Sequence, residues 1–414
     1  MITARRLLVL TLTICSLLMT GCWDALPVEK RIFATAIGLD WVPEQPHLTV
    51  TVIHPLMEEK RARENRVLTF RAHSFGEALA MLHHSSGQQL SLGVLSVIVI
   101  GRQAAEQPLS SFVNDLMAHP DLRLGAYVLV ASGTAQELLA VTPPDHQRIA
   151  VHLRDILHRA VRRSDAPATT LYDFVTHVMT PGADAITALL SPIGTLEHRP
   201  PPGQGAEGAG GGGQQAEGGG KNALPSPPPE DVQVVGAALW QGDTMVGELT
   251  LPMAQHVFVA MGIADAMLMK VLFAPDERFF PGGSVMTLSI EGARADWSLD
   301  LAEGRPHYTL RLDVRLSLHN YAGTVDLSKQ ENSELFEKII ASTFEQNMLE
   351  ALQRLVSTGS DALSLGQLVR LKYPAEWDSK GWRDQLKTAT FGVQTKVEIR
   401  NMGLQLLRLE PVDK

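Results

Sequence analysis

Residues 310–318 read Leu310-Arg311-Leu312-Asp313-Val314-Arg315-Leu316-Ser317-Leu318, an alternation of apolar and polar side chains without a fault. Successive side chains of a strand point to opposite faces of its sheet, so this pattern predicts one buried and one solvated face, typical of antiparallel sheet. From Ser333 the apolar residues follow a helical period: Leu335, Phe336, Ile339, Ile340, Phe344, Met348, Leu352, Leu355 and Val356. At ~1.5 Å per residue, a helix of roughly 25 residues is about 37 Å long and crosses a whole sheet.

The apolar stripe of this helix has two interpretations. A stripe of this width is more often the core side of a helix packed on a sheet than a docking face for a membrane partner. A second helix is predicted from Ala362 to Leu371, before Pro374, and a final alternating strand over 393–400 ends in the turn 401–403. Trp377 and Trp382 either cap an interface or close the core, and the sequence leaves both open.

Shorter elements alternate before this half of the chain. The predicted elements are a hairpin of strands 32–40 and 48–53, a helix at 75–82, a strand at 95–100, a helix at 109–117, a strand at 126–130 and a helix beginning at 135–141. Residues 200–229 are rich in Gly and Pro, which predicts a flexible linker or a disordered surface loop. A hairpin with the turn Gln241-Gly242-Asp243-Thr244 follows it.

These patterns predict an α+β, multi-domain fold with mixed or antiparallel sheets, packed helices and one long helix in the C-terminal half. The expected divisions are a signal peptide at 1–21, an N-terminal α/β domain at 22–199, a linker at 200–230, a middle β-rich domain at 231–303 and a C-terminal α+β domain at 304–414.

The first 22 residues predict export and a lipid anchor. Arg5 and Arg6 precede an uncharged apolar run over 7–19, which is too short to span the ~30 Å hydrocarbon core of a bilayer well. Leu18-Met19-Thr20-Gly21-Cys22 then resembles the lipobox of bacterial lipoproteins, in which the Cys is diacylated and becomes the mature N-terminus. Two acyl chains give stable anchoring, so Cys22 is the predicted lipidation site. A cleaved signal peptide without lipid, or an N-terminal membrane helix, is the alternative.

Charge and cysteine content narrow the function further. The formal net charge is -9, and loss of Arg5 and Arg6 with the signal peptide makes it two units more negative. An acidic body is repelled by nucleic acid and by anionic lipid, so no nucleic-acid partner is expected and the lipid provides the anchoring. Cys15 and Cys22 are the only cysteines, so the processed chain has no disulfide and no free thiolate for catalysis.

No motif in the sequence predicts catalysis, a cofactor or a metal site. Gly220-Lys221 lacks the following Ser or Thr and the helix of a phosphate-binding loop. The adjacent His83 and His84 point about 100° apart on a helix, and the 14 histidines show no metal-ligand spacing. We therefore expect a chain that is not an enzyme, with no cofactor and no metal.

Several segments, taken in order, resemble the Ger(x)C family, the lipoprotein C subunits of spore germinant receptors. The matching segments are 21–24 (Gly-Cys-Trp-Asp), 36–40, 74–79, 97–101, 127–139, 236–240, 245–249, 373–377, Trp382 and 397–403. The chain departs from the family at Asp361-Ala362-Leu363-Ser364-Leu365-Gly366, where a Phe-Gly pair usually follows the Asp, and in its unusually Gly-rich linker.

The resemblance implies a three-domain α+β lipoprotein on the outer face of the inner spore membrane. Its partners would be the polytopic A and B germinant receptor subunits, and its role would be that of a non-catalytic accessory in nutrient-triggered germination. The alternative is a solute-binding lipoprotein of a transporter, but two lobes of repeated βαβ units fit poorly with the alternation at 310–318 and the long helix that follows. An envelope hydrolase, the third possibility, has no supporting motif.

Overall fold

A computed structural model of the chain describes residues 27–56, 65–143, 148–193, 231–276, 278–280, 283–302, 304–319, 321 and 325–401. Its larger sheet has eight strands in the order β10-β9-β8-β7-β6-β2-β3-β4. Their bounds are β2 (Ala36–Trp41), β3 (Leu48–Pro55), β4 (Asn65–Ala72), β6 (Val97–Gly101), β7 (Tyr127–Ala131), β8 (Ile186–Pro192), β9 (Val232–Gln241) and β10 (Thr244–Thr250). The central strands β2, β6, β7 and β8 are parallel, and the outer strands are antiparallel.

Helices cover both faces of the eight-stranded sheet. One face packs on α2 (Phe75–Ser86), α4 (Ser110–Met117) and α7 (Leu171–Met179). The other packs on α5 (Ala135–Leu139) and α6 (Ile149–Arg162). Strands of such a sheet are buried on both sides, which explains why β6 is an unbroken run of apolar residues and glycine, all buried. A 3-10 turn η1 (Val28–Lys30), a small sheet of β1 (Arg31–Phe33) and β5 (Gln89–Ser91), and α3 (Arg102–Ala105) complete this unit.

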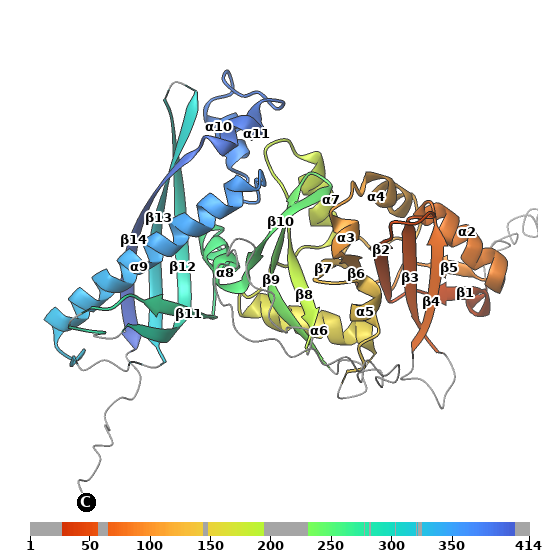
Figure 1. Ribbon diagram of the computed structural model, residues 1–414, viewed down its shortest axis with the longest axis horizontal. Helices are drawn as coiled ribbons and strands as arrows, with labels where there is room; N and C mark the ends of the chain where they lie inside the picture. Colours follow the sequence, from red (N-terminus) through yellow and green to blue (C-terminus); the bar gives the residue numbers. More distant parts are fainter. Residues whose placement is uncertain are drawn as a thin grey trace, which may run out of the picture.

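The second sheet has four strands in the order β11-β12-β13-β14. Its strands are β11 (Met267–Phe273), β12 (Ser284–Ala302), β13 (Arg305–Leu318) and β14 (Thr390–Asn401), and its helices are α9 (Gln330–Ser357), α10 (Leu365–Lys372) and α11 (Trp382–Lys387). Figure 1 shows α9 running along this sheet and α8 (Leu251–Ala260) lying between the two sheets. The core of this unit is continuous with α8 and the near end of β9.

The two patterns that predicted this half are confirmed. The apolar residues of 310–318 are at most 3% exposed, while Arg311, Asp313 and Arg315 are exposed. On α9 the side chains of Phe336, Ile340, Phe344, Met348, Leu352 and Leu355 are fully buried against the sheet. The stripe is therefore the core side of the helix, except at Leu335, which is 38% exposed, and Ile339, which is only partly buried. The sheet is mixed, because β14 pairs parallel with β13.

The expected middle domain at 231–303 is not a separate unit. Its first two strands, β9 and β10, extend the eight-stranded sheet, and β11 and β12 belong to the four-stranded sheet. The backbone N–H of Ile193 donates to the carbonyl of Asp231 at 2.8 Å, so the described chain before and after the predicted linker belongs to adjacent strands of one sheet, β8 and β9. A change in composition marks such a connection but does not show which strands pair across it, and the boundary at 304 likewise falls between the paired strands β12 and β13.

Replacing Phe344 by Ala tests the α9 interface. We expect the free energy of unfolding to fall by about 3–5 kcal/mol, because a fully buried phenyl ring leaves a cavity. Leu335→Ala on the same helix removes a side chain that is 38% exposed and should cost less than about 1 kcal/mol. Urea unfolding followed by tryptophan fluorescence measures both, and equal losses would contradict the packing described.

Candidate functional site

The most constrained polar cluster of the described residues joins the two sheet units. It consists of Asp184, between α7 and β8, and Asp361, Trp382 and Arg383 from the C-terminal unit, with Gly182 and Gly366 beside them. We refer to these six residues as the joint. The backbone N–H of Asp184 donates to the carbonyl of Asp361 at 3.0 Å, so the two segments also touch through their main chains.

Asp184 is 1% exposed, and its carboxylate accepts four hydrogen bonds. Arg383 donates through Nη1 to Oδ2 at 2.8 Å and through Nη2 to Oδ1 at 3.0 Å, a bidentate pair. The backbone N–H of Asp361 donates to Oδ2 at 2.8 Å, and that of Gly242, in the β9–β10 turn, donates to Oδ1 at 2.8 Å. Hydrogen bonding to the Asp184 carboxylate also raises the pKa of Arg383. Every acceptor site of this carboxylate is therefore used.

Asp361 fixes the start of α10. Its Oδ1 accepts from the backbone N–H of Leu365 at 2.6 Å, and its Oδ2 accepts from that of Gly366 at 2.8 Å and from Nε1 of Trp382 at 2.9 Å. These bonds satisfy N–H groups that a helix start leaves free, and α10 accordingly begins at Leu365 rather than at the predicted Ala362. Burial raises the pKa of Asp361 to about 7, and the nearby Asp184 acts in the same direction while the three donors oppose it.

Two glycines allow the backbones to approach. A Cβ on Gly182, whose φ is +79°, would lie 2.6 Å from Cη2 of Trp377 and 3.0 Å from Cα of Gly366. A Cβ on Gly366 would lie 2.6 Å from both Cα of Gly182 and Nε1 of Trp382. Side chains at these positions would therefore push the two units apart. Gln367 also donates to the carbonyl of Pro181 across the same boundary.

A second set of hydrogen bonds ties the units near α8. The hydroxyl of Ser164, just after α6, lies 2.9 Å from the carbonyls of Ile263 and Asp265, and the N–H of Asp265 donates to it at 2.9 Å. Nε2 of Gln255 on α8 donates to Oδ1 of Asp165 at 2.8 Å. Two separated attachments prevent rotation about either one, so the arrangement fixes the orientation of the two sheets.

The sequence did not identify this cluster. Asp361 and Gly366 entered the prediction only within a segment that departs from the family, and Asp184 and Arg383 did not enter it. Trp382 is 2% exposed and closes the core, while Trp377 is half-buried with its ring 5.6 Å from that of Trp382. The signal that identifies the cluster is burial of an Asp beside an Arg that lies 199 residues away in the chain.

The site residue predicted from the sequence, Cys22, lies outside the described residues, as does the predicted linker. None of the helices in the described ranges combines the length and the apolar character needed to span a bilayer. Within the same ranges no group of three or more His, Cys, Asp or Glu side chains is placed to bind a metal ion. His83 and His84 are both exposed, with ring centroids 6.2 Å apart.

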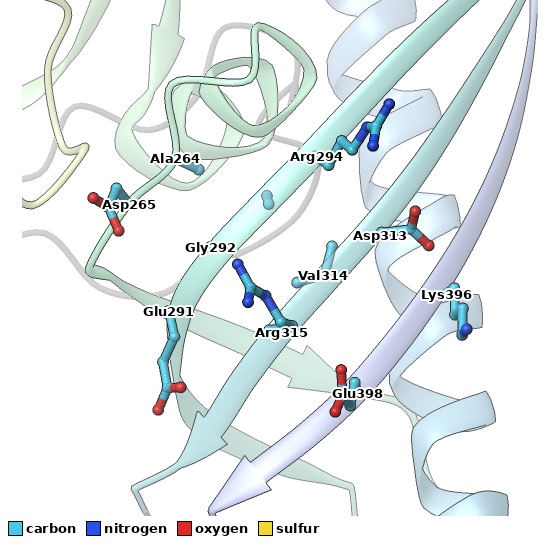
Figure 2. Close-up of a pocket in the computed structure, with 11 residues that line it drawn as sticks. Ala264, Asp265, Glu291, Gly292, Arg294, Asp313, Val314, Arg315, Lys396 and Glu398 are labelled. Atoms are coloured by element: carbon cyan, nitrogen blue, oxygen red, sulfur yellow. The ribbon is translucent and has the colours of Figure 1, made fainter.

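A charged hollow of about 570 Å³ lies on the outer face of the four-stranded sheet (Figure 2). It forms where the β-bulge in β12 places Gly292 opposite Arg315, and a Cβ on Gly292 would lie 3.0 Å from Nη2 of Arg315. Charges alternate in sign across the strands: Arg294, Asp313 and Lys396 lie in one row, and Glu398 lies beside Arg315 in the next. All five are exposed, so water screens them and the hollow defines no ligand.

Comparisons with known proteins agree with this architecture. A family model described as "Spore germination protein N-terminal domain" matches residues 24–192, and one described as "Spore germination B3/ GerAC like, C-terminal" matches residues 235–403. The solved structure titled "Crystal Structure of the GerBC protein" resembles this fold with a TM-score of 0.50 at 14% identity, covering 89% of this chain and 98% of that one. No curated protein matches the chain.

The fold, in which an eight-stranded sheet unit is joined to a four-stranded sheet unit, is thus that of a spore germination protein with two parts. The chain belongs to the Ger(x)C family of spore germination proteins, since models of both of its domains match in order.

Replacing Asp361 by Asn tests the effect of its burial on stability. The raised pKa means that the folded chain binds this proton more tightly than the unfolded chain. The resulting stabilisation is full below pH ~4 and is lost as the pH rises through about 7. The shift corresponds to a decrease on the order of 4 kcal/mol across that window. D361N should lack this decrease, measured as unfolding free energy against pH, and the exposed D300N should keep it. A wild-type slope in D361N would refute the assignment.

Replacing Arg383 by Met leaves the buried Asp184 carboxylate without its cation. We expect a loss of about 3–5 kcal/mol in the free energy of unfolding, because an uncompensated buried charge is costly. Arg383→Lys keeps the charge but not the two-pronged geometry and should lose an intermediate amount. Arg294→Met, at a side chain 77% exposed, is the matched control and should change stability by less than about 0.5 kcal/mol. Urea unfolding measures all three, and an R383M loss no larger than that of the control would contradict the assignment.

Proposed function

We propose that this protein is the lipid-anchored C subunit of a spore nutrient germinant receptor, a non-catalytic accessory that acts with membrane A and B subunits. The observation that carries the proposal is the order of its parts: a segment that resembles a lipobox and ends at Cys22, followed by matches to both domains of a spore germination family over nearly the whole remaining chain.

The geometry supports a body held close to the membrane. The described fold begins at Pro27, five residues after Cys22, and each residue spans at most about 3.6 Å, so the anchor lies within about 18 Å of the folded body. A diacylated Cys22 would thus restrict the eight-stranded unit, which contains the first described strands, to the neighbourhood of the bilayer surface. The proposed site is the outer face of the inner spore membrane.

The joint supports an interaction role. The carboxylates of the joint accept hydrogen bonds from N–H groups of this chain, and these bonds hold the two sheets in one orientation. A body of fixed shape presents the same surface to the A and B subunits without an ordering cost on binding. The alternative of a solute-binding lipoprotein is less well supported, because the two units have different sheets rather than two repeated lobes.

Spores that carry Cys22→Ala test the proposal, with Cys15→Ala as the matched control, since Cys15 lies within the predicted signal peptide. Release of dipicolinic acid is measured after nutrients and, separately, after a germinant that bypasses nutrient receptors. We expect C22A to lose the nutrient response alone and C15A to keep both responses.

Membrane fractionation of the same spores separates the remaining outcomes. A normal nutrient response with the variant still bound to the membrane would refute anchoring through Cys22. A normal response with the variant released would refute the need for anchoring and favour the solute-binding alternative or a second receptor.

A further inference from the structure

The backbone at the edge of a sheet has unpaired N–H and C=O groups that can pair with another strand. At the β14 edge these groups are used, because α9 lies beside the strand. Oε1 of Glu345 accepts from the N–H of Thr395 at 2.7 Å, and Oε1 of Glu337 accepts from the N–H of Ile399 at 3.0 Å. Two carboxylates therefore close this edge.

Two further sheet ends have contacts from neighbouring elements. At β11, Nε2 of Gln255 donates to the carbonyl of Leu268 at 2.9 Å. At β10, the side chain of Thr358 packs directly on the strand, and a Cβ on Gly247 would lie 2.7 Å from its Cγ2. The contact at Gly247 covers one face of β10, because a Cβ leaves a strand perpendicular to its sheet.

The fourth end, β4, is different. Across the described ranges, the only backbone partner of β4 is its neighbour β3, and no side chain hydrogen-bonds to its main chain. Its sequence, Asn-Arg-Val-Leu-Thr-Phe-Arg-Ala, contains no Pro, and Arg66 and Arg71 are its only charged residues, so a partner strand must complement these two charges. Val67 is 51% exposed, and all eight residues are in strand geometry. As far as the described residues show, the outer edge of β4 is therefore free for strand addition.

Charge indicates what this edge would accept. β4 carries Arg66 and Arg71 near its two ends and no acidic residue. Arg66 forms no ion pair with any described residue, and it lies across from His54 on β3. Arg71 has an exposed and weak pair with Glu44 at 3.9 Å. Both arginines can therefore pair with carboxylates from outside the chain.

We propose that β4 binds an extended acidic segment of a partner protein by antiparallel strand addition. Main-chain hydrogen bonds would supply affinity, and acidic side chains five residues apart would lie opposite Arg66 and Arg71. The side chains between the two acidic residues would alternate between the two faces of the sheet. One face would neighbour the half-buried Leu68 and Phe70, and the other would neighbour Val67 and Thr69. Aliphatic and β-branched side chains suit both faces.

A second copy of this chain suits the edge less well. A symmetric antiparallel pair of β4 strands would place no acidic side chain beside Arg66 or Arg71, because β4 contains none. Both arginines would therefore remain without a partner of opposite charge in such a pair. The inference goes beyond the proposed function, because it depends only on this edge and its charges.

Hydrogen–deuterium exchange of the full chain tests the proposal with three synthetic peptides. The first, Glu-Thr-Val-Thr-Val-Glu, has the inferred spacing. The second has Lys at both ends, and the third, Glu-Thr-Pro-Thr-Pro-Glu, lacks the strand N–H groups. We expect the first peptide alone to slow exchange in residues 65–72, and the lysine peptide to bind about tenfold more weakly, because two charge pairs change from attractive to repulsive.

Charge reversal provides the matched control. The double variant R66E/R71E should reverse the preference toward the lysine peptide, and R311E/R315E, on the exposed face of β13, should leave it unchanged. Equal protection by all three peptides, protection outside β4, or an unreversed preference would overturn the proposal. Concentration-dependent protection of β4 without peptide would replace it with pairing between two copies of the chain.

Discussion

The buried carboxylate of Asp184 is the group on which the arrangement of the two sheets depends. A charge removed from water must regain its hydrogen bonds within the protein, and three of the four donors to this carboxylate belong to Asp361 and Arg383 of the C-terminal unit. The fourth comes from the β9–β10 turn. Any displacement of one unit relative to the other would leave that charge unpaired, so the relative orientation of the sheets is fixed by electrostatics as well as by apolar contact.

The close approach at the joint has a steric condition as well. Gly182 and Gly366 lie so near one another that a Cβ on either would reach the other's backbone. The apolar part of the interface is supplied by α8, which packs against β9 on one side and against the four-stranded sheet and α9 on the other. The helix α8 therefore contributes buried apolar surface to the interface, and the hydrogen bonds of the joint fix the relative orientation of the two units.

The connection between β8 and β9 shows why the long Gly-rich and Pro-rich insertion is compatible with this order. The entropic cost of closing a loop grows only slowly with its length. Here the ends are held by the antiparallel pairing of β8 with β9 and by the bond from Ile193 to Asp231. The sheet therefore tolerates the insertion, and the chain continues in the same sheet after it rather than starting a separate domain.

Periodicity in the sequence predicted the elements that depend on local pattern. The alternation at 310–318 and the stripe on α9 follow from the side-chain geometry of strands and helices, and both are confirmed. The α+β class followed from the same patterns, and the family resemblance from short motifs in order. Several elements were not predicted, including α6, α7 and α8. The mostly apolar α8 does not distinguish helix from strand, whereas the helical spacing of Ile149, Leu153, Ile156 and Leu157 in α6 is a signal that could have identified it.

The sequence by itself determined the local structure of the longest elements, the α+β class and the family, because these are recorded in neighbouring residues. Only the tertiary structure decided that β9 and β10 join the N-terminal strands, that Asp184 meets Arg383, and that β4 forms one end of the eight-stranded sheet. These facts depend on contacts between residues far apart in the chain. No periodicity encodes such contacts, since burial and pairing across 199 residues arise only when the whole chain is packed.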